Sequence, residues 1–159
     1  QRRDPQVAAA AARAYIAGDD ALGAQRIIEA SLDRNWDAAL VALYGVCAGD
    51  TVRQIERAEA WLQRQAGDAT LLLTLAQLCA RQGLWGKAQS YVEASIAVEP
   101  TYAAHLEAAR LYERSGNVEA ANGHYRESLA LAVARIRDTE EARRRLYSLR
   151  ASAQATPAG

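Results

Sequence analysis

The chain has little of what a thick globular core requires. It contains no phenylalanine and no methionine, and aromatic residues make up only 6% of its 159 residues. Half of the chain is hydrophobic, much of it alanine, and such small residues allow helices to approach one another closely. The formal net charge is zero, so the basic excess typical of a nucleic-acid-binding module is absent. No apolar run reaches the roughly 18 residues that span a bilayer.

Residues for catalysis or metal binding are equally scarce. Two cysteines without neighbouring histidines give neither a zinc pattern nor a disulfide framework, so we expect Cys47 and Cys79 to be buried small apolar residues. His105 and His124 are the only histidines, and neither belongs to a pattern for nucleophilic catalysis or to a His-x-x-x-His metal motif. The glycines near Lys87 do not have P-loop spacing. The sequence therefore predicts no enzyme, no bound metal and no cofactor.

The chain does contain one segment that occurs twice in similar form. TLAQLCARQGLWGKAQSYVEASIAV begins at Thr74, and EAARLYERSGNVEAANGHYRESLAL begins at Glu107. Gly83 corresponds to Gly116, an offset of 33 residues (116 − 83 = 33). A period near 34 with two apolar segments separated by glycine is typical of stacked helical hairpins. The opening hairpin fits the same template, with Ala12 at the position of Ala76. The two alanines are 64 residues apart (76 − 12 = 64), which leaves room for one slightly short repeat between the two hairpins.

The predicted fold is therefore an all-α solenoid of about four helical hairpins, the second of them degenerate. We expect a single domain over residues 5–153, and the connections are short enough to favour antiparallel helix pairs. The predicted hairpins span 5–37, 38–67, 68–101 and 102–133.

The pattern changes after Val133. Asp138 followed by Glu141 resembles a capping box, which predicts a separate terminal helix over 138–153. We interpret this segment mainly as a helix that covers the last hairpin and exposes a charged face to water. An alternative is a patch for an acidic partner or a membrane surface, although Glu140 and Glu141 dilute its positive charge. Residues 154–159 are expected to form a disordered tail.

The pattern of small and aromatic residues resembles the tetratricopeptide repeat, with alanine at the helix crossings, glycine at the turn and Pro100 at a joint. Cys79 and Val92 depart from it, because aromatic residues are common at their positions. The phrases NWDAALVALYGV and LLLTLAQLCARQGLWGKAQSYVEASI also resemble the HemY family over residues 5–133. That resemblance implies a membrane-anchored protein associated with haem biosynthesis. The chain starts at Gln1, which favours a fragment whose anchor lies outside it.

The resemblance also implies that the first helix of each hairpin lines an inner groove. By register, the predicted groove residues are Arg13, Leu73, Gln77, Arg81, Leu106, Arg110 and Arg114. Arginine recurs at equivalent positions, Arg13 with Arg110 and Arg81 with Arg114. These arginines are either ordinary solvated charges or a means of gripping the carboxylates of a partner over the apolar side chains Leu73 and Leu106. The lysine and asparagine clamp of some tetratricopeptide domains is absent.

The leading functional hypothesis is a non-catalytic protein-interaction scaffold at the cytoplasmic face of a bacterial inner membrane. Haem-pathway enzymes are its candidate partners, and no nucleic-acid partner is expected. One alternative is a direct haem or porphyrin carrier, with His105 as the candidate iron ligand. Another is a generic repeat adaptor in envelope assembly.

Overall fold

The computed structural model describes the backbone of residues 3–154 and the side chains of residues 5–149. Within that range the chain consists of helices joined by short turns, and it contains no strand. The helices are α1 (Arg3–Ala17), α2 (Ala21–Arg34), α3 (Ala38–Val46), α4 (Thr51–Leu62), α5 (Ala69–Arg81), α6 (Trp85–Val98), α7 (Tyr102–Arg114) and α8 (Val118–Gln154). The predicted all-α solenoid of helical hairpins is confirmed.

Short polar side chains start most of these helices. The N-cap side chain accepts a hydrogen bond from the backbone N–H three residues later, which satisfies a donor that the first turn of a helix leaves open. These N-caps are Asp20, Asp37, Asp50, Asp68 and Thr101. The turns α5–α6 and α7–α8 contain Gly83 and Gly116 at φ values of +75° and +81°. Both glycines lie at the turns that the repeat predicted, and both have the left-handed conformation that favours glycine.

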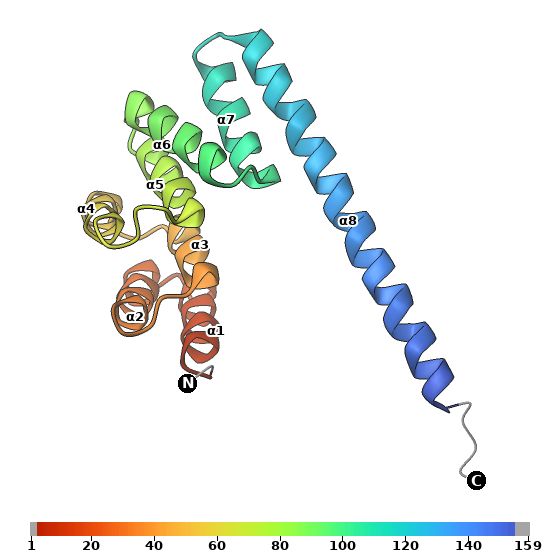
Figure 1. Ribbon diagram of the computed structural model, residues 1–159. Coiled ribbons are helices and arrows are strands. Elements are labelled where there is room, and N and C mark those ends of the chain that lie inside the picture. The colour runs from red at the N-terminus through yellow and green to blue at the C-terminus, as the bar shows by residue number, and fades with distance from the viewer. Residues whose placement is uncertain (1–2, 155–159) are drawn as a thin grey trace.

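The hairpins stack in chain order, so that α3 packs between α1 and α5, and α5 contacts α7. Figure 1 shows α1 and α3 on the side of the array that faces α8, with α2 and α4 on the far side. Alanines lie where the two helices of a hairpin cross: Ala12, Ala24, Ala76, Ala88, Ala109 and Ala121 are all buried. Cys47 and Cys79 are free and fully buried, as predicted.

The second hairpin is the irregular one. Tyr44 of α3 and Trp61 of α4 are both buried, and their ring centroids lie 5.2 Å apart. These large rings hold the two helices apart, and α4 packs more closely against α5 than against its own hairpin partner α3. Aromatic residues thus fill the space between the helices of this hairpin, where the other hairpins have alanine.

The end of the chain differs from the prediction. No separate helix begins near residue 138, because α8 runs without interruption from Val118 to Gln154. Between Gly123 and Gln154 there is no glycine or proline to stop it, and Arg137, Glu140 and Glu141 near Asp138 are good helix formers. Residues 133–149 are all exposed, so this segment does not cover the last hairpin. Gln154 is still helical, and the rest of the predicted tail, 155–159, lies outside the described residues.

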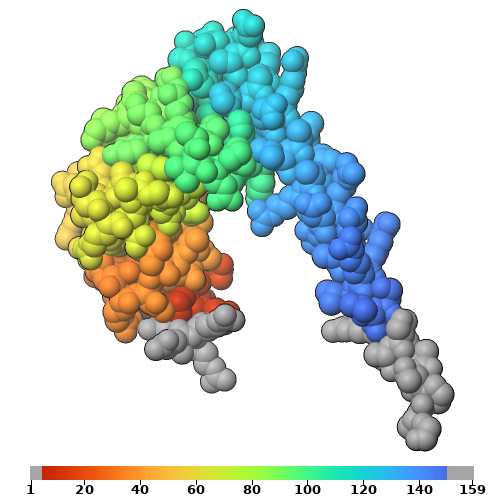
Figure 2. Space-filling view, in the orientation of Figure 1, coloured from red at the N-terminus to blue at the C-terminus, as the bar shows by residue number. Residues whose placement is uncertain are grey.

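The continuous α8 gives the molecule the outline of an arch. In Figure 2 the stacked hairpins form one side of the arch and the second half of α8 forms the other, with open space between them. Within the described residues, no helix is both long and apolar enough to cross a membrane.

Candidate partner-binding groove

The N-caps define equivalent positions on three successive first helices. Asp37, Asp68 and Thr101 cap α3, α5 and α7. Residues five and nine positions after a cap lie on the same face of the helix, one turn apart. The resulting set, which we call the groove row, consists of Ala42, Leu73 and Leu106 at the fifth position and Val46, Gln77 and Arg110 at the ninth.

The groove row is largely apolar and open to water. Val46 is 62% exposed, whereas Leu73 and Leu106 are half-buried between neighbouring helices. Gln77 is also half-buried and lies beside Gly45, where an added Cβ atom would be 2.7 Å from its Oε1. Four of the predicted residues, Leu73, Gln77, Leu106 and Arg110, lie at equivalent positions on the neighbouring helices α5 and α7.

The sequence analysis missed the contribution of the second hairpin. Ala42 and Val46 were not predicted as groove residues, because that hairpin was treated as irregular. A signal was available in the sequence, since DAALVALYG after Asp37 aligns with DATLLLTLA after Asp68 at an offset of 31 residues (68 − 37 = 31). This alignment places Val46 opposite Gln77.

Arg81 has a structural contact rather than a free guanidinium. Its two terminal nitrogens donate hydrogen bonds to the carbonyl oxygens of Cys47 at 2.9 Å and Gly45 at 2.6 Å. Buried Gln54 also donates from Nε2, to the carbonyls of Tyr44 and Cys47. Helix α3 ends at Val46, and its last carbonyls have no intrahelical partner. Arg81 and Gln54 therefore supply donors that the end of α3 requires.

Arg114, the equivalent of Arg81 in the next repeat, is also occupied. Its guanidinium carbon lies 3.8 Å from the centroid of the Trp85 ring, a stacked cation–π contact between α7 and the start of α6. The two arginines thus hold neighbouring hairpins together. Of the predicted arginines, only Arg13 and Arg110 are exposed without such a contact between hairpins, and Arg110 pairs with Glu107 at 3.6 Å on its own helix.

The two histidines contact each other between α7 and α8. His105 is 9% exposed, and its Nδ1 lies 2.9 Å from Nδ1 of His124. The His124 ring stacks on Tyr112 with centroids 5.3 Å apart, and the Tyr112 hydroxyl donates to Glu93 of α6 at 2.7 Å. Burial, and to a lesser extent the charge of His124, lower the pKa of His105. One ring must donate and the other accept, so the contact cannot survive protonation of both Nδ1 atoms.

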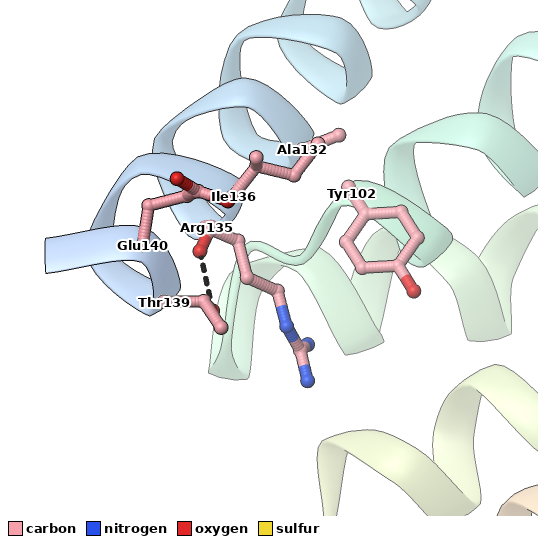
Figure 3. A pocket seen from close by; sticks show the side chains of 6 residues that line it. All are labelled: Tyr102, Ala132, Arg135, Ile136, Thr139 and Glu140. Atoms are coloured by element: carbon pink, nitrogen blue, oxygen red, sulfur yellow. Dashed lines mark hydrogen bonds between the residues drawn. The ribbon is translucent and has the colours of Figure 1, made fainter. Parts of the chain in front are cut away.

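A shallow pocket lies where α8 leaves the array. It has a volume of about 380 Å³ and lies between Tyr102, at the start of α7, and one face of α8 (Figure 3). The α8 residues that line it are Ala132, Arg135, Ile136, Thr139 and Glu140. The Arg135 guanidinium carbon is 5.8 Å from the Tyr102 ring centroid. Within the described residues, no group of three or more His, Cys, Asp or Glu side chains could hold a metal ion.

Stacked hairpins with small residues at their crossings form an all-α helical solenoid with a tetratricopeptide-like fold. Among solved structures, the chain is similar to a crystal structure of MamA, with a TM-score of 0.62 and 15% identity over 86% of this chain and 84% of that one. It is also similar to "MamA MSR-1 C2", with a TM-score of 0.58 and 14% identity over 77% of this chain and 74% of that one. At such low identity the similarity establishes the fold alone.

No protein-family model matches the chain, and no curated protein is significantly similar to it. The comparisons do not assign the chain to the HemY family, so that assignment stays a prediction.

The contact of Arg81 with α3 predicts a loss of stability on substitution. Arg81→Met removes two donors from carbonyl groups at the end of α3, and we expect the free energy of unfolding to fall by about 1 to 2 kcal/mol. Arg110→Met is the matched control, because Arg110 is exposed and should change stability by less than about 0.5 kcal/mol. Urea unfolding of both variants checks this. Equal stabilities would show that Arg81 is available for a ligand after all.

The buried His105 predicts a pH-dependent stability. Its depressed pKa means that the unfolded chain takes up a proton more readily than the folded one. The stabilisation is therefore complete above the unfolded pKa of about 6.5 and is lost as the pH falls below it. The charged or titratable groups that act on His105 are His124 and Glu127 on α8. His124 in turn stacks on Tyr112 of α7, whose hydroxyl donates to Glu93 of α6.

We expect the free energy of unfolding to decline between about pH 7.5 and 5.5 and the decline to flatten in His105→Phe. Urea titrations at several pH values provide the measurement. This pH window lies above the pH range in which the Glu93 carboxylate is protonated, because the pKa of Glu93 is lowered. An unchanged slope in the variant would contradict the assignment to the histidine pair.

Proposed function

We propose that this protein is a non-catalytic interaction module that binds a segment of a protein partner along the groove row. The observation that carries the proposal is the recurrence of accessible apolar side chains at the fifth position of α3, α5 and α7 (Ala42, Leu73 and Leu106), with Val46 one turn further along α3. Val46 is 62% exposed, and Leu73 and Leu106 are half-buried. Full burial of each such side chain under a partner contributes about 1.5–3 kcal/mol at most, so several together support a specific complex.

The surroundings of the row indicate what kind of segment it accepts. An extended strand or a short helix that presents apolar residues at regular spacing matches the repeat of the first helices. Arg13 and Arg110 lie at the same register as Val46 and Gln77, towards opposite ends of the array. They favour acidic residues at the ends of the bound segment, where charge complementarity gives orientation more than affinity.

A catalytic role is less well supported. The imidazoles, which are the groups most often used for proton transfer near neutral pH, contact each other rather than a nucleophile. Both thiols are fully buried, and burial raises the pKa of each, which disfavours the reactive thiolate. Binding by shape is therefore the function that these residues favour.

The resemblance to the HemY family supports a more specific proposal. The partner would be an enzyme of haem biosynthesis, and the module would be held at the cytoplasmic face of the inner membrane by an anchor outside this sequence. A generic adaptor in envelope assembly uses the same groove with a different partner. Partner identity separates these two.

Direct haem carriage is the competing function, and the histidine geometry counts against it. His105 is 9% exposed and its Nδ1 faces His124 at 2.9 Å, which leaves little access for a porphyrin. We expect titration with haemin to give no saturable one-to-one Soret shift that depends on His105. The measurement compares the wild-type protein with His105→Ala. A saturable shift that is lost in the variant would favour the carrier over the scaffold.

A matched pair of valines tests the groove. Val46→Glu places a charge in the groove row on α3, whereas Val52→Glu makes the same change on α4, where Val52 is 49% exposed. We expect affinity capture from bacterial extracts to recover a partner with wild type and Val52→Glu, and roughly tenfold less of it with Val46→Glu. Mass spectrometry then identifies the partner as a haem-pathway enzyme or an envelope-assembly protein. Equal recovery with both variants would reject the groove.

A further inference from the structure

Past the contact of Arg135 with Tyr102, the second half of α8 does not pack against the array. We call residues 133–149 the α8 extension; all of them are exposed, and Figures 1 and 2 show the helix standing clear of the array. It carries large apolar side chains, among which Ile136 is 63% exposed and Tyr147 is 59% exposed. An isolated helix of this length is marginally stable in water, and helices in proteins gain most of their stability from a packed apolar face.

One face of the extension has the spacing of a coiled-coil seam. Ile136, Glu140, Arg143 and Tyr147 follow one another at intervals of four, three and four residues, which keeps them on one side of the helix. The Arg143 guanidinium carbon lies 5.7 Å from the centroid of the Tyr147 ring, so these two side chains do share a face. Ile136 and Glu140 both line the pocket beside Tyr102 (Figure 3).

Arg135 and Arg137 open the extension, and in residues 138–145 the charges form two blocks of opposite sign. Asp138, Glu140 and Glu141 come first, and Arg143, Arg144 and Arg145 follow directly after Ala142. Read in the reverse direction, the order of the signs is inverted. A helix with this property is complementary to a second copy of itself placed antiparallel, whereas a parallel copy would bring like charges together.

We propose that the α8 extension is the contact surface of a homodimer in which two copies pair antiparallel about Glu141 and Ala142. The residue numbers that face each other add up to the same value, since 136 + 147 and 140 + 143 both equal 283. Glu140 then faces Arg143 of the second copy in two central layers. Ile136 faces the second copy's Tyr147 in the two layers outside them. The two-fold axis makes every contact occur twice.

The composition of the seam predicts a weak but register-specific dimer. The Ile136–Tyr147 layers supply apolar burial. In the Glu140–Arg143 layers the cost of desolvating the charges offsets much of their attraction, so these layers mainly fix the relative orientation of the two helices. Arg137 and Arg144, which flank the seam on one side, would oppose each other across the pair and reduce the affinity. The interface falls at the small end of specific protein contacts, so the dimer should dissociate on dilution into the low micromolar range.

Charge exchange tests this pairing. We expect sedimentation velocity of the whole chain at low salt to show a concentration-dependent species of twice 17.2 kDa (2 × 17.2 = 34.4 kDa). Glu140→Arg or Arg143→Glu alone puts like charges into both central layers and should weaken association at least roughly tenfold. The double variant Glu140→Arg/Arg143→Glu restores opposite charges in every layer and should recover the dimer.

Glu141→Arg is the matched comparison, because it makes the same charge change in the acidic block but outside the seam, and it should weaken association less than Glu140→Arg. Far-UV circular dichroism verifies that all variants keep their helices. A wild-type chain that is monomeric at every concentration overturns the proposal, as does a double variant that fails to recover. Binding of the extension to vesicles of anionic lipid by a monomeric chain would likewise overturn it and assign the face to a membrane surface.

Discussion

The structure depends on close approach between the two helices of a hairpin. Ala12 and Ala24, Ala76 and Ala88, and Ala109 and Ala121 lie at these crossings and are almost fully buried. Side chains of this size let backbones approach, so that each hairpin is flat enough to stack on the next. The chain can therefore form a continuous array with few aromatic residues, and the first helices of successive hairpins place equivalent residues on the same side of the array.

The second hairpin shows what happens where that constraint is relaxed. Tyr44 and Trp61 separate α3 from α4, and the C-terminal end of α3 is left with carbonyl groups that need donors. Gln54 and Arg81 satisfy them, one from the same hairpin and one from the next. An irregular repeat is thus integrated into the array by polar contacts in addition to its buried apolar side chains.

The sequence predicted the all-helical solenoid and the glycine turns, because a 33-residue offset and left-handed turns leave a clear pattern. It predicted the extent of α8 wrongly, since a capping signal at Asp138 cannot end a helix that lacks a breaking residue before it. The roles of Arg81 and Arg114 could not be read from register, because an arginine at one position can cap a helix, stack on a ring or face solvent. Which of these occurs depends on neighbours from other hairpins, such as Gly45 and Trp85.

The length of α8 gives a local contact a long reach. Only the first part of this helix packs on α7, where His105 meets His124. From Ala134 to Gln154 the helix extends about 30 Å further. Gln154 lies about 45 Å along the helix from His124, so a rotation of about 10° at the histidine contact would move the far end by about 8 Å. Helix α8 is therefore a long arm whose base rests on the hydrogen bond between His105 and His124, and that bond depends on the protonation of the two rings.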